Sequence, residues 1–153
     1  MRRMNDSFGF LFGDISRLLR RQFDERARTI GVTRPQWRVL LILTRNPGIN
    51  QGGLAELLEV EPISACRMVD RLQEAGLVER RPDPADRRAW RLYLSDAARP
   101  LLDDLRLLGE ELFEKAMTGL SSDERDELRR SLEAVRENLS FRPSDQSGVS
   151  ING

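Results

Sequence analysis

The sequence predicts a mainly α fold with one small β-hairpin. Three observations lead to this prediction. Apolar residues recur every three or four positions along most of the chain, which is the spacing of amphipathic helices. The spacing changes to alternation within residues 77–94, as expected for two strands. Glycine and proline residues separate the segments, and 153 residues suffice for one domain with a core and a small appendage.

The first predicted helix begins near Phe8 and carries one apolar stripe as far as Phe23. Asp6 or Ser7 is its candidate N-cap, and Gly31 ends it. This stripe lies outside the compact middle of the chain. We therefore expect a further surface to cover it.

The second predicted helix lies in "VTRPQWRVLLIL". Thr33 is its cap, and Pro35 falls in the first turn, where a missing N–H costs little. Trp37 and residues 39–43 make this helix apolar nearly all round, so we expect it to be buried. The sequence "NPG" at residues 46–48 ends it.

Two short helices follow. Asn50 caps the first of them, and its three leucines are predicted to face inward: Leu54, Leu57 and Leu58. The turn "EVEP" leads into "PISACRMVDRLQEAG", which Gly76 closes. Two short helices joined by a tight turn after a buried helix form the helix-turn-helix arrangement.

The hairpin is predicted from "LVERRP" and "RAWRLYL", with Trp90, Leu92 and Leu94 on one face of the second strand. Between them, "DPADR" has the composition of a tight turn. This predicts that Arg87 and Arg88 lie at the turn, beyond the strands. Residues 79–94 hold five arginines in a chain with no net charge, so this cluster needs an explanation.

Two longer helices are predicted after the hairpin. Ser95 caps the first, which runs to about residue 119, although Pro100 in its second turn indicates a later start or a bend. Ser121 and Glu124 match a capping box that opens the last helix, which runs to about residue 139. The polar, Gly/Ser-rich residues 141–153 are predicted to be a disordered tail.

The composition excludes most enzyme chemistry. The chain has no histidine and one cysteine, so His-based catalytic pairs, multi-cysteine zinc sites and internal disulfides are unavailable. No lysine follows the glycines of "NQGGLAEL", so it is not a phosphate loop. We therefore expect no enzyme, no cofactor and no metal; a carboxylate-based hydrolase is an alternative without a supporting motif. No apolar run could span a bilayer and no secretion signal is recognisable, which predicts a cytoplasmic protein without a membrane partner.

The fourth predicted helix has the side chains of a DNA-reading helix. Its core side carries Ala65, Met68, Val69 and Leu72 at steps of about 100°. Its outer side and flanks carry Ile63, Ser64, Cys66, Arg67, Asp70, Arg71 and Glu74. In the N-terminal half, Ile63 suits a thymine methyl group, Ser64 is an adaptable donor or acceptor, and Arg67 suits a guanine. Arg71 suits a phosphate. Judged from this helix alone, the alternative to a DNA-reading helix is a pair of helices whose polar face is simply exposed to water.

The hairpin favours the DNA interpretation. Arg87 and Arg88 could enter the narrow minor groove, whose negative potential attracts arginine. Asp86 is predicted to hold an arginine in position across the turn. Arg80 and Arg81 on the first strand are predicted to reach nearby phosphates. A solvated turn is the alternative, but the position directly after a helix-turn-helix favours a nucleic-acid contact.

Two motifs at this separation carry a family resemblance. The pattern R-x-V-D-R-L-x-x-x-G-L-V-x-R is met by Arg67, Val69, Asp70, Arg71, Leu72, Gly76, Leu77, Val78 and Arg80, and the wing pattern D-x-R by Asp86 and Arg88. Over about residues 6–140 the chain resembles the multiple-antibiotic-resistance regulator (MarR) family of winged helix-turn-helix transcription factors. The resemblance implies a winged helix-turn-helix domain at 33–95 and a helical dimerisation region at 6–32 and 96–140.

The implied function is that of a sequence-specific regulator of transcription. It would be a ligand-responsive homodimeric repressor that binds a pseudo-palindromic operator in double-stranded DNA. A winged-helix protein-interaction module without DNA binding is the alternative.

The resemblance also raises two regulatory hypotheses. Family members often bind small aromatic or anionic effectors between the dimer helices and the winged domain, where Phe8, Phe12, Trp37 and Arg38 could line a pocket. For each of these residues singly, a core or dimer contact is the stronger interpretation. Cys66 lies on the DNA-facing side beside Arg67, and a neighbouring cation favours the reactive thiolate. Its oxidation could therefore disturb DNA contact.

Overall fold

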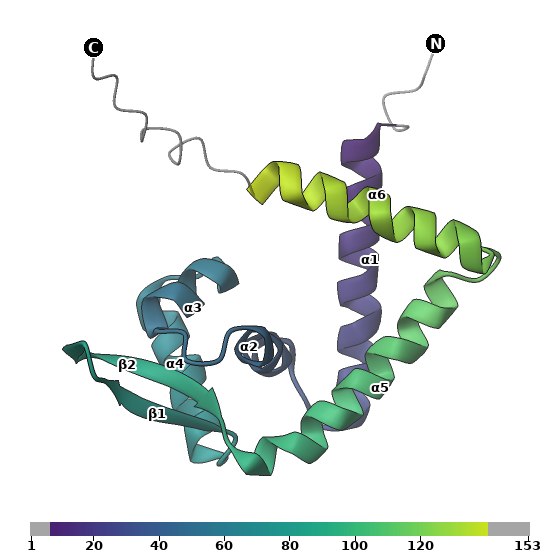
Figure 1. Cartoon of the computed structure of the whole chain (residues 1–153). Helices are drawn as coiled ribbons and strands as arrows, with labels where there is room; N and C mark the ends of the chain where they lie inside the picture. The colour runs from purple at the N-terminus through teal and green to yellow at the C-terminus, as the bar shows by residue number, and fades with distance from the viewer. Residues whose placement is uncertain (1–6, 141–153) are drawn as a thin grey trace, which may run out of the picture. The chain divides into compact units, whose positions relative to one another are not determined.

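The computed structural model describes residues 7–140, which form two compact parts, residues 7–113 and 114–140. The described chain is mainly α-helical with one two-stranded antiparallel hairpin, which confirms the predicted fold class (Figure 1). Asp6 and the predicted tail at 141–153 lie outside the described residues. The elements, in order, are α1 (Phe8–Thr29), α2 (Arg34–Arg45), α3 (Gln51–Leu58), α4 (Pro62–Glu74), β1 (Val78–Asp83), β2 (Asp86–Leu94), the 3-10 helix η2 (Asp96–Ala98), α5 (Arg99–Ala116) and α6 (Ser122–Ser140).

Helix α1 is capped as predicted but is buried over a short stretch. The Ser7 hydroxyl accepts a hydrogen bond from the Phe10 amide at 3.4 Å. The buried residues of α1 are Phe23 and Ala27, near its C-terminal end. The Phe23 ring meets the Trp37 ring of α2 edge-on, with centroids 4.8 Å apart. Leu19 is half-buried against the core, and the rest of the apolar stripe on α1 is exposed within this chain.

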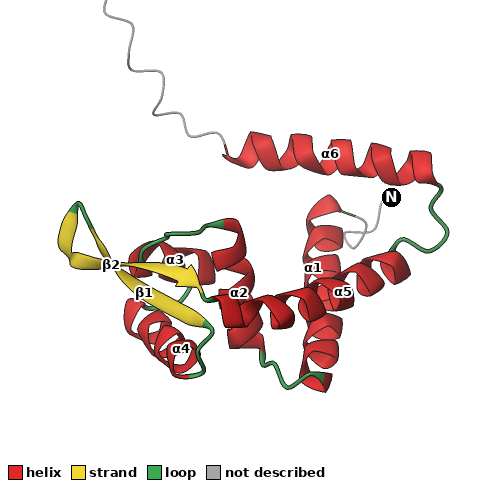
Figure 2. Ribbon diagram, turned by 60° about the horizontal axis from the view of Figure 1, so that its bottom comes forward, coloured by secondary structure: helices red, strands yellow, loops and turns green. Residues whose placement is uncertain are grey.

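The core of the first part surrounds α2, which confirms in part the prediction that this helix is buried, because Leu41 is 37% exposed and Ile42 is half-buried. Val39, Leu40 and Leu43 of α2 are inaccessible or nearly so. Figure 2 shows α3, α4 and the hairpin gathered beside α2. Their side chains complete the core: Leu54, Leu58, Ala65, Val69, Leu72, Val78 and Leu92.

The prediction for Leu57 is wrong, because its side chain is 51% exposed. Leu54 and Leu58 are buried as predicted, and Ala55 is the third inward residue of α3. At about 100° per residue, positions 54, 55 and 58 form one stripe, and position 57 falls roughly 100° from its centre. The hydrophobic character of Leu57 therefore does not indicate whether its side chain faces the core or the solvent.

The hairpin is longer toward its tip than the sequence predicts. The turn consists of Pro84 and Ala85, and Asp86 already pairs with Asp83. The prediction that Arg87 and Arg88 lie in the turn is therefore wrong, because both belong to β2.

Carboxylates fix the backbone at both ends of this short turn. Asp83 accepts a hydrogen bond from the Ala85 amide, and Asp86 accepts one from the Arg88 amide, each at 2.9 Å. These bonds hold the two-residue reversal, and Asp86 pairs with Asp83 directly after it. The register then shifts, because the next pair is Pro82 with Trp90, and residues 87–89 of β2 have no partner on β1.

A further extended segment joins β2 just before α3. The Gly48 amide donates to the Leu92 carbonyl at 3.0 Å, and the Leu92 amide donates to the Ile49 carbonyl at 2.9 Å. Asn50 forms an isolated bridge with Arg91 and then caps α3, accepting from the Gly53 amide at 2.7 Å. The first turn of α3 is thereby anchored to the hairpin.

Local end signals set the limits of the helices that follow. Gly76 has φ +75°, which suits its place directly after the last residues of α4, and it confirms the predicted end of that helix. η2 precedes α5, so the long helix begins after Ser95, as Pro100 indicates. Leu105 and Leu112 of α5 are buried.

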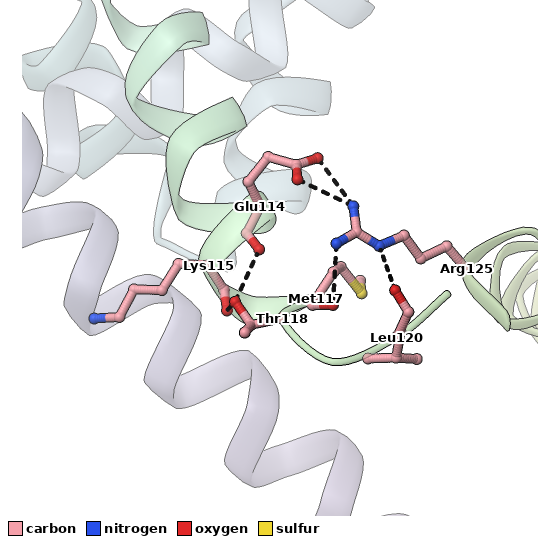
Figure 3. A network of polar contacts seen from close by, with 6 residues as sticks. All are labelled: Glu114, Lys115, Met117, Thr118, Leu120 and Arg125. Carbon is pink, nitrogen blue, oxygen red and sulfur yellow. Dashed lines mark hydrogen bonds and ion pairs between the residues drawn. The ribbon is translucent and has the colours of Figure 1, made fainter. Parts of the chain in front are cut away.

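The second part consists of the end of α5, a turn and α6, held together by one arginine (Figure 3). Arg125 donates to both carboxylate oxygens of Glu114 at 3.2 and 3.0 Å, and to the carbonyls of Met117 and Leu120. Ser121 and Glu124 exchange hydrogen bonds at 3.1 and 3.2 Å, which confirms the predicted capping box.

Within residues 7–140, no helix combines the length and the apolar character needed to cross a membrane. The same residues contain no cluster of three or more potential metal ligands.

Candidate nucleic-acid interface

Helix α4 has one side in the core and the other exposed to solvent, as the sequence predicts. Ala65, Val69 and Leu72 are buried, and Met68 is half-buried against them. The outward side carries six exposed residues, Ile63, Ser64, Arg67, Asp70, Arg71 and Glu74, and the half-buried Cys66. The N-terminal half therefore exposes an apolar group at Ile63, a hydroxyl at Ser64 and a guanidinium at Arg67. These are the groups that can contact the base edges of DNA.

Four arginines of α4 and the hairpin are available to a partner. Arg67 and Arg71 on α4 and Arg87 and Arg88 on β2 are exposed. Among the described residues, none of the four forms an ion pair with a carboxylate. Guanidinium groups without a carboxylate partner are free to bind phosphates or guanine.

Asp86 does not hold an arginine side chain as predicted; it fixes the Arg88 backbone. The carboxylate that pairs with an arginine at this turn is Asp83, 3.3 Å from Arg91. The hydrogen bond from the Ala85 amide lowers the pKa of Asp83, and Arg91 lowers it further against the opposing effect of burial. The sequence predicts Asp86 within the turn, whereas the structure places it at the start of β2.

Arg80 differs from the sequence prediction of a phosphate-binding side chain. Its side chain is 15% exposed and its guanidinium faces protein groups. It pairs with Asp70 of α4 at 2.6 Å and donates to Gln51 of α3 at 2.9 Å. Arg81 is also engaged, lying over the Tyr93 ring at 4.4 Å and pairing with Glu79 at 3.0 Å.

The cation beside Cys66 is Arg80 rather than Arg67. Nη2 of Arg80 lies 3.7 Å from Sγ of Cys66 and 3.3 Å from the Cys66 carbonyl oxygen. Arg67 is next to Cys66 in the sequence and is therefore predicted to be this cation, but its side chain is exposed. Adjacent residues on a helix point about 100° apart, whereas β1 passes next to α4.

The four predicted effector-pocket residues do not come together within one chain. Phe8 is 77% exposed and Phe12 44% exposed near the start of α1. Trp37 is buried against Phe23, and Phe12 lies eleven positions before Phe23 on the same helix, about 16 Å away. Arg38 donates to the Leu58 carbonyl at 3.1 Å and so supports the end of α3.

The order of elements defines the class of this protein. Two short helices, α3 and α4, pack against the buried α2, and a β-hairpin follows them directly. This is a winged helix-turn-helix protein, in which α4 holds the position of the recognition helix and the hairpin holds that of the wing.

Comparison with known proteins gives the family. The family model described as MarR family matches residues 30–89. The uncharacterized HTH-type transcriptional regulator YybA of Bacillus subtilis (strain 168) is 29% identical over 127 residues, which cover 83% of this chain and 85% of YybA. The chain belongs to the MarR family. Members of this family are transcription regulators, which confirms the prediction that the chain is not an enzyme.

Solved structures agree with this assignment. The transcriptional regulator PA3341 is 31% identical with a TM-score of 0.75, over 89% of this chain and 100% of that one. A cysteine-to-serine mutant of MarR from E. coli, solved in complex with operator DNA, is 27% identical with a TM-score of 0.67. That match covers 83% of this chain and 91% of the MarR chain.

Proposed function

We propose that this chain is a homodimeric repressor that binds a pseudo-palindromic operator in double-stranded DNA. The observation that carries the proposal is the set of four exposed arginines on α4 and on the wing that have no carboxylate partner within residues 7–140. They sit on the two elements that winged helix-turn-helix proteins use for DNA. The related MarR of E. coli, solved with operator DNA, supports the same use of the fold.

The two elements would contact different grooves. Helix α4 would enter the major groove, where Ile63, Ser64 and Arg67 meet base edges and Arg71 meets a phosphate. The wing would follow the backbone to the minor groove with Arg87 and Arg88. Asp86 would contribute by fixing the Arg88 backbone.

We propose that a second copy of the chain packs against the exposed apolar stripe on α1. Five large apolar side chains of the stripe are 43–77% exposed: Phe8, Leu11, Phe12, Ile15 and Leu18. Helix α6 carries three more, Leu132, Val135 and Leu139. So much exposed apolar surface on helices is typical of an interface. We accordingly assign residues 33–95 to DNA binding and residues 6–32 and 96–140 to dimerisation.

The proposed repressor acts in the cytoplasm and responds to a small aromatic or anionic effector. Trp37 and Arg38 are occupied by contacts within the chain, so the effector would be held by a surface that the dimer completes. The expected result is that a panel of small aromatic carboxylates contains compounds that release the protein from DNA. If no compound of the panel changes DNA affinity, this part of the proposal fails.

A selection of bound fragments from genomic DNA tests the central part. Fragments retained by the protein should share two half-sites about one helical turn apart, and light scattering should give two chains per duplex. A winged-helix protein-interaction module is the competing function. It would retain no fragment above background at low salt.

A further inference from the structure

Arg80 lies in a polar cluster that joins α3, α4 and β1. Its Nε donates to Gln51 at 2.9 Å and its Nη1 to Gln73 at 2.5 Å. Its Nη2 pairs with Asp70 at 2.6 Å and donates to the Cys66 carbonyl oxygen at 3.3 Å. The Arg80 cluster therefore consists of these five residues, from two helices and the first strand of the wing.

The cluster leaves Arg80 little capacity to bind a phosphate. A guanidinium has five N–H donors, and the four contacts above use all but one of them. The side chain is 15% exposed. Arg67 and Arg88 are exposed and have no carboxylate partner among the described residues, so their situation is different.

The charge of Asp70 is the part of the cluster that DNA would meet. Asp70 lies on the outward side of α4, one turn after Arg67, and its side chain is 51% exposed. A free carboxylate there would repel the phosphates on either side of the major groove. The Arg80 guanidinium at 2.6 Å offsets that charge.

We propose that Arg80 is a positioning residue for DNA recognition that does not itself contact DNA. It holds α4 against α3 and the wing, and it cancels the charge of Asp70 on the DNA-facing side. The inference rests on the proposed function, since it assumes that α4 enters the major groove.

The test compares DNA affinity and its salt dependence in four full-length proteins: wild type, Arg80→Gln, Asp70→Asn, and the double variant. Arg80→Gln should weaken binding to the selected duplex roughly tenfold, the effect expected when a charge-assisted contact is lost. The uncompensated carboxylate would repel the phosphates and salt screens that repulsion, so the slope of log affinity against log salt should also fall, and Asp70→Asn should restore it. Asp70→Asn in the Arg80→Gln background should recover most of the loss, since the uncompensated charge is gone.

Arg88→Ala is the matched control for a direct phosphate contact. It should reduce the salt slope, and Asp70→Asn should not rescue it. The inference is overturned if Arg80→Gln binds like wild type, or if it lowers the slope as Arg88→Ala does and Asp70→Asn restores nothing. If wild type binds no duplex, the proposed function fails and this inference falls with it.

A second variant covers the case in which Arg80→Gln does not fold, as judged by thermal unfolding. Arg80→Lys gives up the forked contacts to Gln51, Gln73 and the Cys66 carbonyl but keeps the positive charge beside Asp70, so the loss of affinity should stay below about tenfold. A tenfold loss in Arg80→Lys that Asp70→Asn does not relieve would overturn the inference.

Discussion

Asp24 illustrates how one side chain connects α1 to the winged domain. Its carboxylate accepts hydrogen bonds from Arg34 Nε at 2.6 Å and from Trp37 Nε1 at 2.8 Å, both on α2. Burial alone would raise the pKa of Asp24. The hydrogen bonds from Arg34 and Trp37 outweigh burial and lower the pKa below its ordinary value of 3.8.

Asp24→Asn should therefore destabilise the protein in a pH-dependent way. A carboxyl with a lowered pKa in the folded state stabilises the fold above its unfolded pKa, and that contribution is lost as the pH falls through the folded pKa. At pH 7 the variant should lose about 1–3 kcal/mol of unfolding free energy. Urea unfolding between pH 7 and pH 3 should show this difference shrinking below about pH 4. A difference that is constant over the whole range would contradict the assigned role of the Asp24 charge.

Arg67 and Arg88 should differ in the kind of binding they support. Arg67→Ala should relax the preference at one base position in each half-site, at a cost of about 1–3 kcal/mol for the preferred base. Arg88→Ala should weaken binding to all duplexes alike and reduce the salt slope by about one contact per half-site. Titrations on single-base variants of the operator, at several salt concentrations, measure both effects. If the two variants give the same profile, the assignment of separate grooves is wrong.

At the scale of elements, α1 combines two different environments. Its C-terminal end belongs to the core through Phe23 and Ala27. Its first half exposes apolar side chains to water. Burying this surface would stabilise the protein by about 25 cal/mol for each Å² of apolar area. The helix is therefore expected to pack against this chain at one end and against a second copy along the rest.

Ile15→Asp should dissociate the proposed dimer, because it places a charge in the middle of the apolar stripe. Ile15 is 52% exposed in the single chain, so the folded protomer should tolerate the change. Gly13→Asp is the matched control, since a Cβ at Gly13 meets no atom within 4 Å and the position faces away from the stripe. Light scattering should give a monomer for Ile15→Asp and a dimer for Gly13→Asp. A dimer in both would place the interface elsewhere.

At the scale of the whole molecule, the net charge is zero, but the arginines have different roles. Arg125 closes the turn between α5 and α6, and Arg80 lies inside the winged domain, whereas Arg67 and Arg88 are exposed without a carboxylate partner within the described chain. Composition alone cannot separate these roles, because they depend on which carboxylates folding brings near.

What the sequence predicts correctly is mostly local. The caps at Ser7 and Ser121, the end at Gly76 and the two sides of α4 depend on neighbours within one or two turns of helix. The errors concern contacts that only the folded chain decides. Arg80 meets partners 7 to 29 residues away, and Leu57 projects away from a core whose direction a short helix does not reveal.

The most direct test of the account is a salt titration of operator binding with the number of chains per duplex determined at each step. The account predicts two chains per duplex and an affinity that falls steeply with salt, as expected when several arginines displace counterions. The account would be contradicted if the protein did not bind the selected duplexes at low salt, or if only one chain bound to each duplex.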